Sequence, residues 1–182
     1  MLWPHRILFA AARALGRTLV AAPRAAAWLL VLSWYGLIWW SSSRPGSSEP
    51  SHWAWTVLSN AAHAPLFGLW AAWLSLLAPR SGGWPRLASR ERAALLAVVA
   101  VGGLVDELHQ HWISTARDFS LLDLATDLTG AALALELVAH LAAPQASARS
   151  WGLRLGLAAA GSFAAGGAAT FLPLCFPGVS WL

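Results

Sequence analysis

Five long apolar stretches constrain the fold of this chain more than any other feature of its sequence. Each is about 18 to 23 residues long, enough for a helix to cross a hydrocarbon core of about 30 Å. Hydrophobic residues make up 58% of the 182 residues and charged residues only 11%, a composition far more apolar than that of an ordinary soluble domain. The stretches cover residues 25–42, 57–77, 93–113, 121–142 and 151–172.

The sequence therefore predicts an all-α fold, a polytopic transmembrane helix bundle of about five spans. Gly161, Gly166 and Gly167 weaken the helix propensity of the last stretch, so a re-entrant or loosely packed segment is an alternative there. We divide the chain into a basic N-terminal segment (1–24), a four-helix membrane domain (25–142) and a C-terminal fifth span with its tail (143–182).

Arginine placement predicts the orientation, because the chain contains no lysine. Ten of the twelve arginines lie before the first span, between the second and third, or around the start of the fifth, and only Arg44 and Arg117 lie elsewhere. By the positive-inside rule the N-terminus is then cytoplasmic and the C-terminus outside. Arginines near one face of residues 1–24 favour an interfacial helix. Membrane topology and contact with anionic lipid headgroups account for the net charge of +4. We therefore expect the lipid bilayer as a partner, and no nucleic acid.

A polar cluster interrupts the apolar pattern, since five of the eight acidic residues lie between Asp106 and Asp127. Ionisable groups are costly in hydrocarbon, so they usually pair, line a polar cavity or mark a reaction site. The third predicted span ends, and the second and fourth begin, on the outer side, which brings their polar residues to one depth. These residues are Asn60, His63, Glu107, Gln110, Asp123 and Asp127, with Arg117 and Asp118 in the loop above them.

These residue types can support acid–base chemistry. Glu107 would be the general acid or base, His63 a second proton-transfer group, and Arg117 a clamp for a phosphate or carboxylate. Asp123 and Asp127 would form a pair that binds a metal ion or a hydroxyl group. The residues leave the presence of a metal or other cofactor open.

Three further residues complete the candidate site. Gln110 belongs to the catalytic set, and Asn60 and Asp118 join the loop arginine as candidate substrate-binding groups. The structural alternative is that the same groups form buried pairs that hold the bundle together, for instance Glu107 with His63 or the loop arginine with Asp123.

The motifs, taken as a set, are Asn60-x-x-His63, Gly103-x-x-Asp106-Glu107-x-x-Gln110, Arg117-Asp118 and Asp123-x-x-x-Asp127-x-x-Gly130. Over residues 33–141 this set resembles the VanZ-like family of small bacterial membrane proteins. Asp127 stands where that family commonly has asparagine, and Asn60 where it has lysine or asparagine. The resemblance implies a multi-pass protein of the bacterial inner membrane, in a family whose founding member is associated with low-level teicoplanin resistance.

Two functions are open at this point. One is an enzyme that acts on a lipid-linked or other cell-envelope component at the outer leaflet. The other is a non-catalytic binding or transport module whose polar cluster is structural or relays protons. The sequence specifies neither the substrate nor the oligomeric state.

The topology can be tested by labelling single cysteines in a Cys175→Ser background. Cysteines at positions 48 and 115 should react in intact cells with a membrane-impermeant thiol reagent, because both lie in predicted outer loops. A cysteine introduced in place of Ser81 should react only after the cells are opened. Labelling at position 81 in intact cells would reverse the orientation.

Overall fold

The computed structural model describes residues 4–43, 52–113 and 119–175, and within these ranges it forms six helices and one short hairpin. Arg117 and Asp118 therefore lie outside the described residues. The helices are α1 (Pro4–Ala21), α2 (Arg24–Ser42), α3 (Trp53–Ser75), α4 (Ser89–Ile113), α5 (Leu121–Ala142) and α6 (Ala148–Cys175), and the hairpin strands are β1 (Arg80–Ser81) and β2 (Trp84–Pro85).

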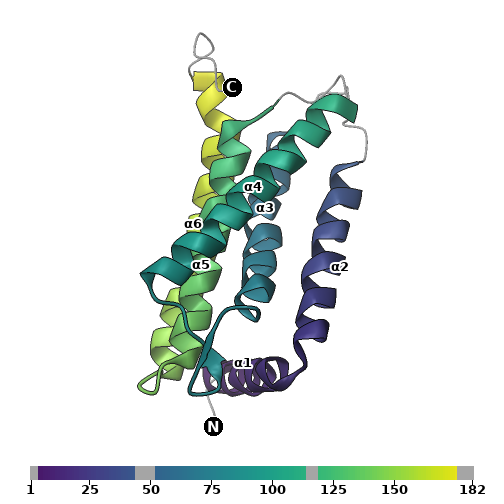
Figure 1. Cartoon of the computed structure of the whole chain (residues 1–182). Coiled ribbons are helices and arrows are strands. Elements are labelled where there is room, and N and C mark those ends of the chain that lie inside the picture. The colour runs from purple at the N-terminus through teal and green to yellow at the C-terminus, as the bar shows by residue number, and fades with distance from the viewer. Residues whose placement is uncertain (1–3, 44–51, 114–118, 176–182) are drawn as a thin grey trace.

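The helices form a bundle with α1 lying across one end (Figure 1). Helices α3, α5 and α6 pack against one another, α4 packs mainly on α5, and α2 packs on α3 and α4. This arrangement confirms the all-helical prediction. By length and composition, three described helices are apolar enough to cross a membrane: α2, α4 and α6. The last contains the predicted stretch 151–172 as one continuous helix of 28 residues.

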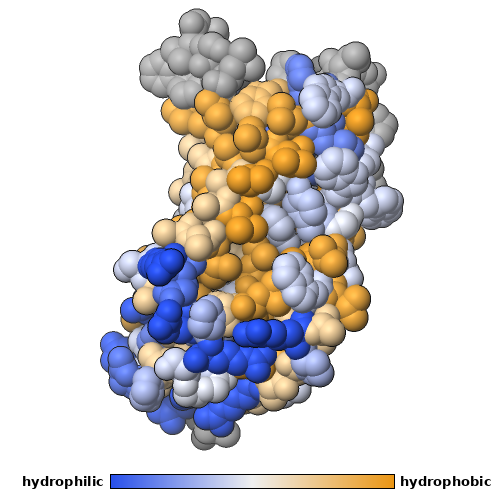
Figure 2. Space-filling view, in the orientation of Figure 1, coloured by the Kyte–Doolittle hydropathy of each residue, from blue (hydrophilic) through white to orange (hydrophobic). Residues whose placement is uncertain are grey.

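The surface is largely apolar, as a bundle surrounded by lipid requires. Leucines, tryptophans and other large hydrophobic residues are exposed on α2, α4 and α6, for example Leu32, Val101 and Leu157, each more than 60% exposed. Figure 2 shows hydrophobic surface over much of the bundle and hydrophilic side chains gathered toward the end where α1 lies. Such a distribution is compatible with a membrane protein.

The closest helix contact joins α3 to α5. A Cβ atom added to Gly130 would overlap the backbone carbonyl of Ala64, and one added to Gly68 would lie 3.0 Å from the carbonyl oxygen of Gly130. Small residues at these positions let the two backbones approach, which is how membrane helices commonly associate. Phe67 and Leu135, both about 1% exposed, pack in the core beside this contact.

Arginines at the end that carries α1 join neighbouring elements. Arg92 of α4 donates to Glu136 of α5 at 2.7 Å, and Arg154 of α6 donates to the other oxygen of the same carboxylate. The loop that the sequence marked only as basic contains the hairpin, whose turn residues Gly82 and Gly83 have positive φ angles of 58° and 77°. Glycine adopts this backbone region without the steric cost that a side chain imposes.

Gly130→Ala should destabilise the protein by roughly 3 kcal/mol, because the added methyl group meets backbone rather than a flexible side chain. Gly166→Ala should also be harmful, since its Cβ would lie 2.5 Å from the backbone nitrogen of Ala61. Gly167→Ala is the matched control: nothing lies within 4 Å of its Cβ position, so helix propensity alone should make it neutral or stabilising by up to ~1 kcal/mol. Thermal unfolding in detergent measures all three, and equal melting temperatures for Gly130→Ala and Gly167→Ala would contradict this packing.

Candidate functional site

The polar residues gather at the end of the bundle opposite α1, where α2 and α4 end and α3 and α5 begin (Figure 1). Two helix starts there are capped by side chains. The Nδ1 atom of His52 accepts from the backbone N–H of Ala54 at 3.3 Å, and the Ser120 hydroxyl accepts from that of Asp123 at 3.1 Å. Such caps satisfy backbone donors that the first helical turn leaves unpaired.

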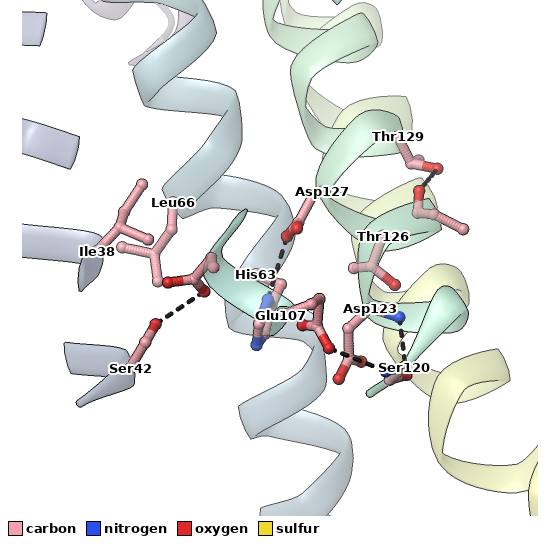
Figure 3. Close-up of polar contacts among 12 residues, drawn as sticks. Ile38, Ser42, His63, Leu66, Glu107, Ser120, Asp123, Thr126, Asp127 and Thr129 are labelled. Atoms are coloured by element: carbon pink, nitrogen blue, oxygen red, sulfur yellow. Dashed lines mark hydrogen bonds and ion pairs between the residues drawn. The ribbon is translucent and has the colours of Figure 1, made fainter. Parts of the chain in front are cut away.

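The central contact of the site is between His63 on α3 and Asp127 on α5. The Nδ1 atom of His63 lies 3.1 Å from Oδ1 of Asp127, whose side chain is only 1% exposed (Figure 3). Gly103 on α4 leaves room for this carboxylate, because a Cβ there would lie 2.9 Å from Oδ2 of Asp127. Three helices therefore fix the position of one histidine–aspartate pair.

A second polar group links α2 to α4 through Asp106. The hydroxyl of Ser42 and the side-chain amide of Gln110 both donate to Oδ2 of Asp106, each at 2.8 Å. Among the residues that the structure describes, Oδ1 of Asp106 has no hydrogen-bond partner although it is buried. The pattern is unusual, because buried carboxylate oxygens are normally satisfied.

A cavity of about 170 Å³ connects these two polar groups. It contains space for several water molecules or for one small polar group. Its wall contains both polar and apolar residues. The polar residues are Ser41, Ser42, Ser59, His63, Asp106 and Gln110, and the apolar residues are Ile38, Ala62, Leu66 and Phe67.

Glu107 faces α5 rather than His63. Its Oε2 atom accepts from the backbone N–H of Ser120 at 2.9 Å (Figure 3), and its buried Oε1 atom has no partner among the described residues. The pairing of Glu107 with His63, one example given for the structural alternative, is not observed, because His63 pairs with Asp127. Adjacent helical positions point about 100° apart, so Asp106 contacts α2 while Glu107 contacts the start of α5.

The other site residues predicted from the sequence do not contact the His63–Asp127 pair through a described hydrogen bond. The Asn60 amide donates to the hydroxyl of Thr170 on α6 at 3.0 Å, and Asn60 is not among the residues that line the cavity. Asp123 lies at the start of α5 and is partly exposed, near Glu107 and Ser120 (Figure 3). Arg117 and Asp118, predicted to bind substrate, fall outside the described residues.

Asp127, predicted to act with Asp123 on a metal ion or a hydroxyl group, bonds His63. Within residues 4–43, 52–113 and 119–175, no group of three or more histidine, cysteine or carboxylate side chains lies close enough together to hold a metal ion. The described part of the site thus offers an acid–base pair, two incompletely bonded carboxylates and several hydroxyl groups.

Sequence reasoning gave no role to three residues that the structure adds to the site. Asp106 lay in a quoted motif next to Glu107, and Ser42 and Ser59 lay at span ends. A signal was present for Asp106, because it stands four residues before Gln110 and the two share a helix face. No comparable spacing connects Ser42 or Ser59 to the acidic cluster.

Comparison of the chain with protein-family models, with curated proteins and with solved structures gives no match.

A double-mutant cycle tests the central contact. His63→Gln and Asp127→Asn should each lower the melting temperature modestly, and the double variant should lose less stability than the sum of the two, with a coupling energy of roughly 1 to 2 kcal/mol. His140→Gln combined with Asp127→Asn is the control, because His140 bonds Ser150 near the other end of α5 and should show no coupling. Additive effects for His63 and Asp127 would mean that the two side chains do not interact.

Proposed function

We propose that the chain is a VanZ-like membrane protein of the bacterial inner membrane, with five spans and a cytoplasmic N-terminus. Its polar site at the outer face binds, and acts chemically on, a lipid-linked or other cell-envelope component. The observation that carries this proposal is the pair of His63 and Asp127, whose histidine lines a cavity of about 170 Å³.

The five-span arrangement is supported by helix length and by the placement of polar groups. Helices α3 and α5 have 23 and 22 residues, enough at 1.5 Å per residue to cover about 30 Å of hydrocarbon. Each packs against α4 and α6, and Asp127 of α5 is buried within the bundle rather than at its surface. Spans with polar residues can cross lipid in this way, because neighbouring helices enclose those residues.

The histidine–aspartate pair supports proton transfer. When the Nδ1 side of an imidazole is held by a carboxylate, the ring is oriented and its Nε2 atom can exchange a proton with a bound molecule. His63 is 20% exposed at its side chain and lines the cavity. We infer that His63 is the general acid or base and that Asp127 orients it.

Glu107 has a second proton-transfer role in this proposal. Its Oε2 atom accepts from the backbone N–H of Ser120, and its buried Oε1 atom has no partner among the described residues. A carboxylate held on one side and unbonded on the other is positioned for proton exchange. The sequence offers no motif of a known nucleophile, so the reaction type is left at acid–base chemistry.

The non-catalytic alternative also has a specific observation in its favour. The hydrogen bonds of Ser42 and Gln110 to Asp106 join α2 to α4, which is what a structural polar group in a membrane bundle would do. A binding or transport module would keep these hydrogen bonds to Asp106 and would not require proton transfer at His63.

The resemblance to VanZ-like proteins supplies the cellular context of the proposal. It supports glycopeptide tolerance, in particular toward teicoplanin, as a phenotype to measure beside the turnover of labelled envelope lipids. These two readouts can be compared for each variant per molecule of folded protein.

His63→Gln and Glu107→Gln should each lower lipid turnover or teicoplanin tolerance, with turnover falling by about a hundredfold or more, because general acid–base groups contribute on this order. Folded protein in the membrane should stay close to the wild-type amount. His140→Gln, the same substitution at the other end of the bundle, should leave activity unchanged. Normal activity per folded molecule in His63→Gln would reject the enzyme and leave the non-catalytic module.

A further inference from the structure

We propose that the cavity beside Asp106 binds a primary ammonium group, carried either by a lipid headgroup or by a free amine. The proposal rests on the proposed function, since it names the ligand chemistry of the same site. Its basis is the state of the Asp106 carboxylate, which is distinct from the proton-transfer pair of His63 and Asp127.

Asp106 is an acceptor that the described protein satisfies only in part. The residue is 1% exposed, and both of its described hydrogen-bond donors, Ser42 and Gln110, are neutral and contact the same oxygen. The other oxygen, Oδ1, is buried without a partner among the described residues. Asp106 also lines the cavity, so a molecule bound there lies against this carboxylate, and a small rotation of the side chain would present Oδ1 to it.

Charge indicates what kind of donor is required. A carboxylate in a low-dielectric environment is costly unless a positive charge or a proton accompanies it. Neutral donors from Ser42 and Gln110 stabilise the charge without cancelling it. A charged N–H donor at Oδ1 would provide the opposite charge and the hydrogen bond together, which makes it the stronger partner.

The other groups of the cavity fit an ammonium ion better than a bare metal ion. An ammonium group has three N–H donors, and Ser41 and Ser59 line the same wall as Asp106. The volume of about 170 Å³ exceeds what a single ion fills, and Phe67 and Leu66 offer apolar surface for the methylene groups attached to the nitrogen. The metal-binding alternative lacks a set of carboxylate or imidazole ligands within the described ranges.

The cavity lies toward the end of the bundle that carries exposed tryptophans. Tryptophans are exposed at the same end of the bundle, where α2 and α4 end and α3 begins, and exposed tryptophans concentrate at the membrane–water interface. These residues are Trp39, Trp40, Trp53, Trp55 and Trp112. Asp106 lies six residues before Trp112 on α4, which is about 9 Å along the helix, so an ammonium group has to extend from the headgroup layer into the bundle to reach it.

The test compares lipids that separate charge from N–H donation. The full-length protein is placed in nanodiscs of phosphatidylglycerol doped with phosphatidylethanolamine, with phosphatidylcholine or with neither, and its melting temperature is measured. Ethanolamine carries a charged N–H donor, choline carries the charge without N–H, and glycerol carries hydroxyl donors without the charge. We expect the melting temperature to rise with phosphatidylethanolamine and not with the other two compositions. An equal rise with phosphatidylcholine, or no rise, would overturn the proposal.

Variants assign the effect to Asp106. Asp106→Asn keeps the shape and the acceptor for Ser42 and should weaken the apparent affinity for phosphatidylethanolamine by about ten- to a hundredfold, as expected for one hydrogen bond to a charged group. Glu136→Gln removes a carboxylate at the other end of the bundle and should leave the lipid-dependent rise intact. Should Asp106→Asn fail to fold, Ser59→Ala keeps the carboxylate and should reduce the rise by a smaller factor. A full rise in Asp106→Asn, or no reduction in Ser59→Ala where that variant is the one measured, would overturn the assignment.

Soluble ethanolamine distinguishes the two sources of the ammonium group. Added to nanodiscs of phosphatidylglycerol alone, it should raise the melting temperature if a free amine can bind, and a rise confined to phosphatidylethanolamine assigns the site to the lipid. If the lipid series fails while His63→Gln still abolishes activity, only the ammonium inference is lost. If the series succeeds while His63→Gln and Glu107→Gln keep full activity, the binding site stands and the catalytic function fails.

Discussion

The close approach of α3 and α5 is the constraint on which the rest of the structure depends. Gly130 lies against the backbone of Ala64 with no room for a side chain, and His63 is the residue immediately before Ala64. A helix pair held at this distance brings His63 within 3.1 Å of Asp127, which lies one turn before Gly130 on α5. The glycine packing and the His63–Asp127 contact are therefore parts of the same interface between α3 and α5. A wider separation of the two helices would leave the buried carboxylate of Asp127 without its histidine partner.

The cost of charge in hydrocarbon explains how the other polar groups are arranged. At the end that carries α1, Glu136 meets two arginines, so its charge is balanced by cations from the protein. At the opposite end, Asp106 and Glu107 each have one buried oxygen without a described partner. A bundle selected only for stability would gain from apolar residues at such positions. Glu91, near the first end, also has a buried oxygen without a described partner, but its carboxylate pairs with Arg86. No described arginine pairs with Asp106 or Glu107, and this lack of a cation is the reason for proposing a function at the second end.

The positions of the helices were predicted well, because the length of an apolar stretch can be read directly from the local sequence. The fourth predicted stretch, 121–142, coincides with α5, and the first differs from α2 by one residue. The cluster of polar residues at one end was also predicted, since helix order and depth follow from the same stretches. The short hairpin was missed, because two glycines with positive φ and a two-residue pairing leave no hydrophobic periodicity.

Partners within the site could not be predicted in the same way. Spacing along a helix places residues on a common face, but the rotation of one helix against another depends on tertiary packing. The structural alternative gave Glu107 as an example of a partner for His63, and the structure pairs His63 with Asp127. Asn60, a candidate substrate-binding residue, bonds Thr170 on α6. Asp106 was given no role although its spacing from Gln110 placed the two on one helix face. Its bond to Ser42, 64 positions away, could not be predicted, because it forms only when α2 packs beside α4.

Solid-state NMR on the protein in lipid bilayers tests directly whether His63 contacts Asp127. With histidine labelled with ¹⁵N and aspartate with ¹³C, the account predicts a through-space correlation between Nδ1 of His63 and the side-chain carboxyl carbon of Asp127, which should disappear in Asp127→Asn prepared with unlabelled asparagine. A His63 imidazole that shows no contact with the Asp127 carboxyl group, in protein that is folded in the bilayer, would contradict both the α3–α5 interface and the site built on it.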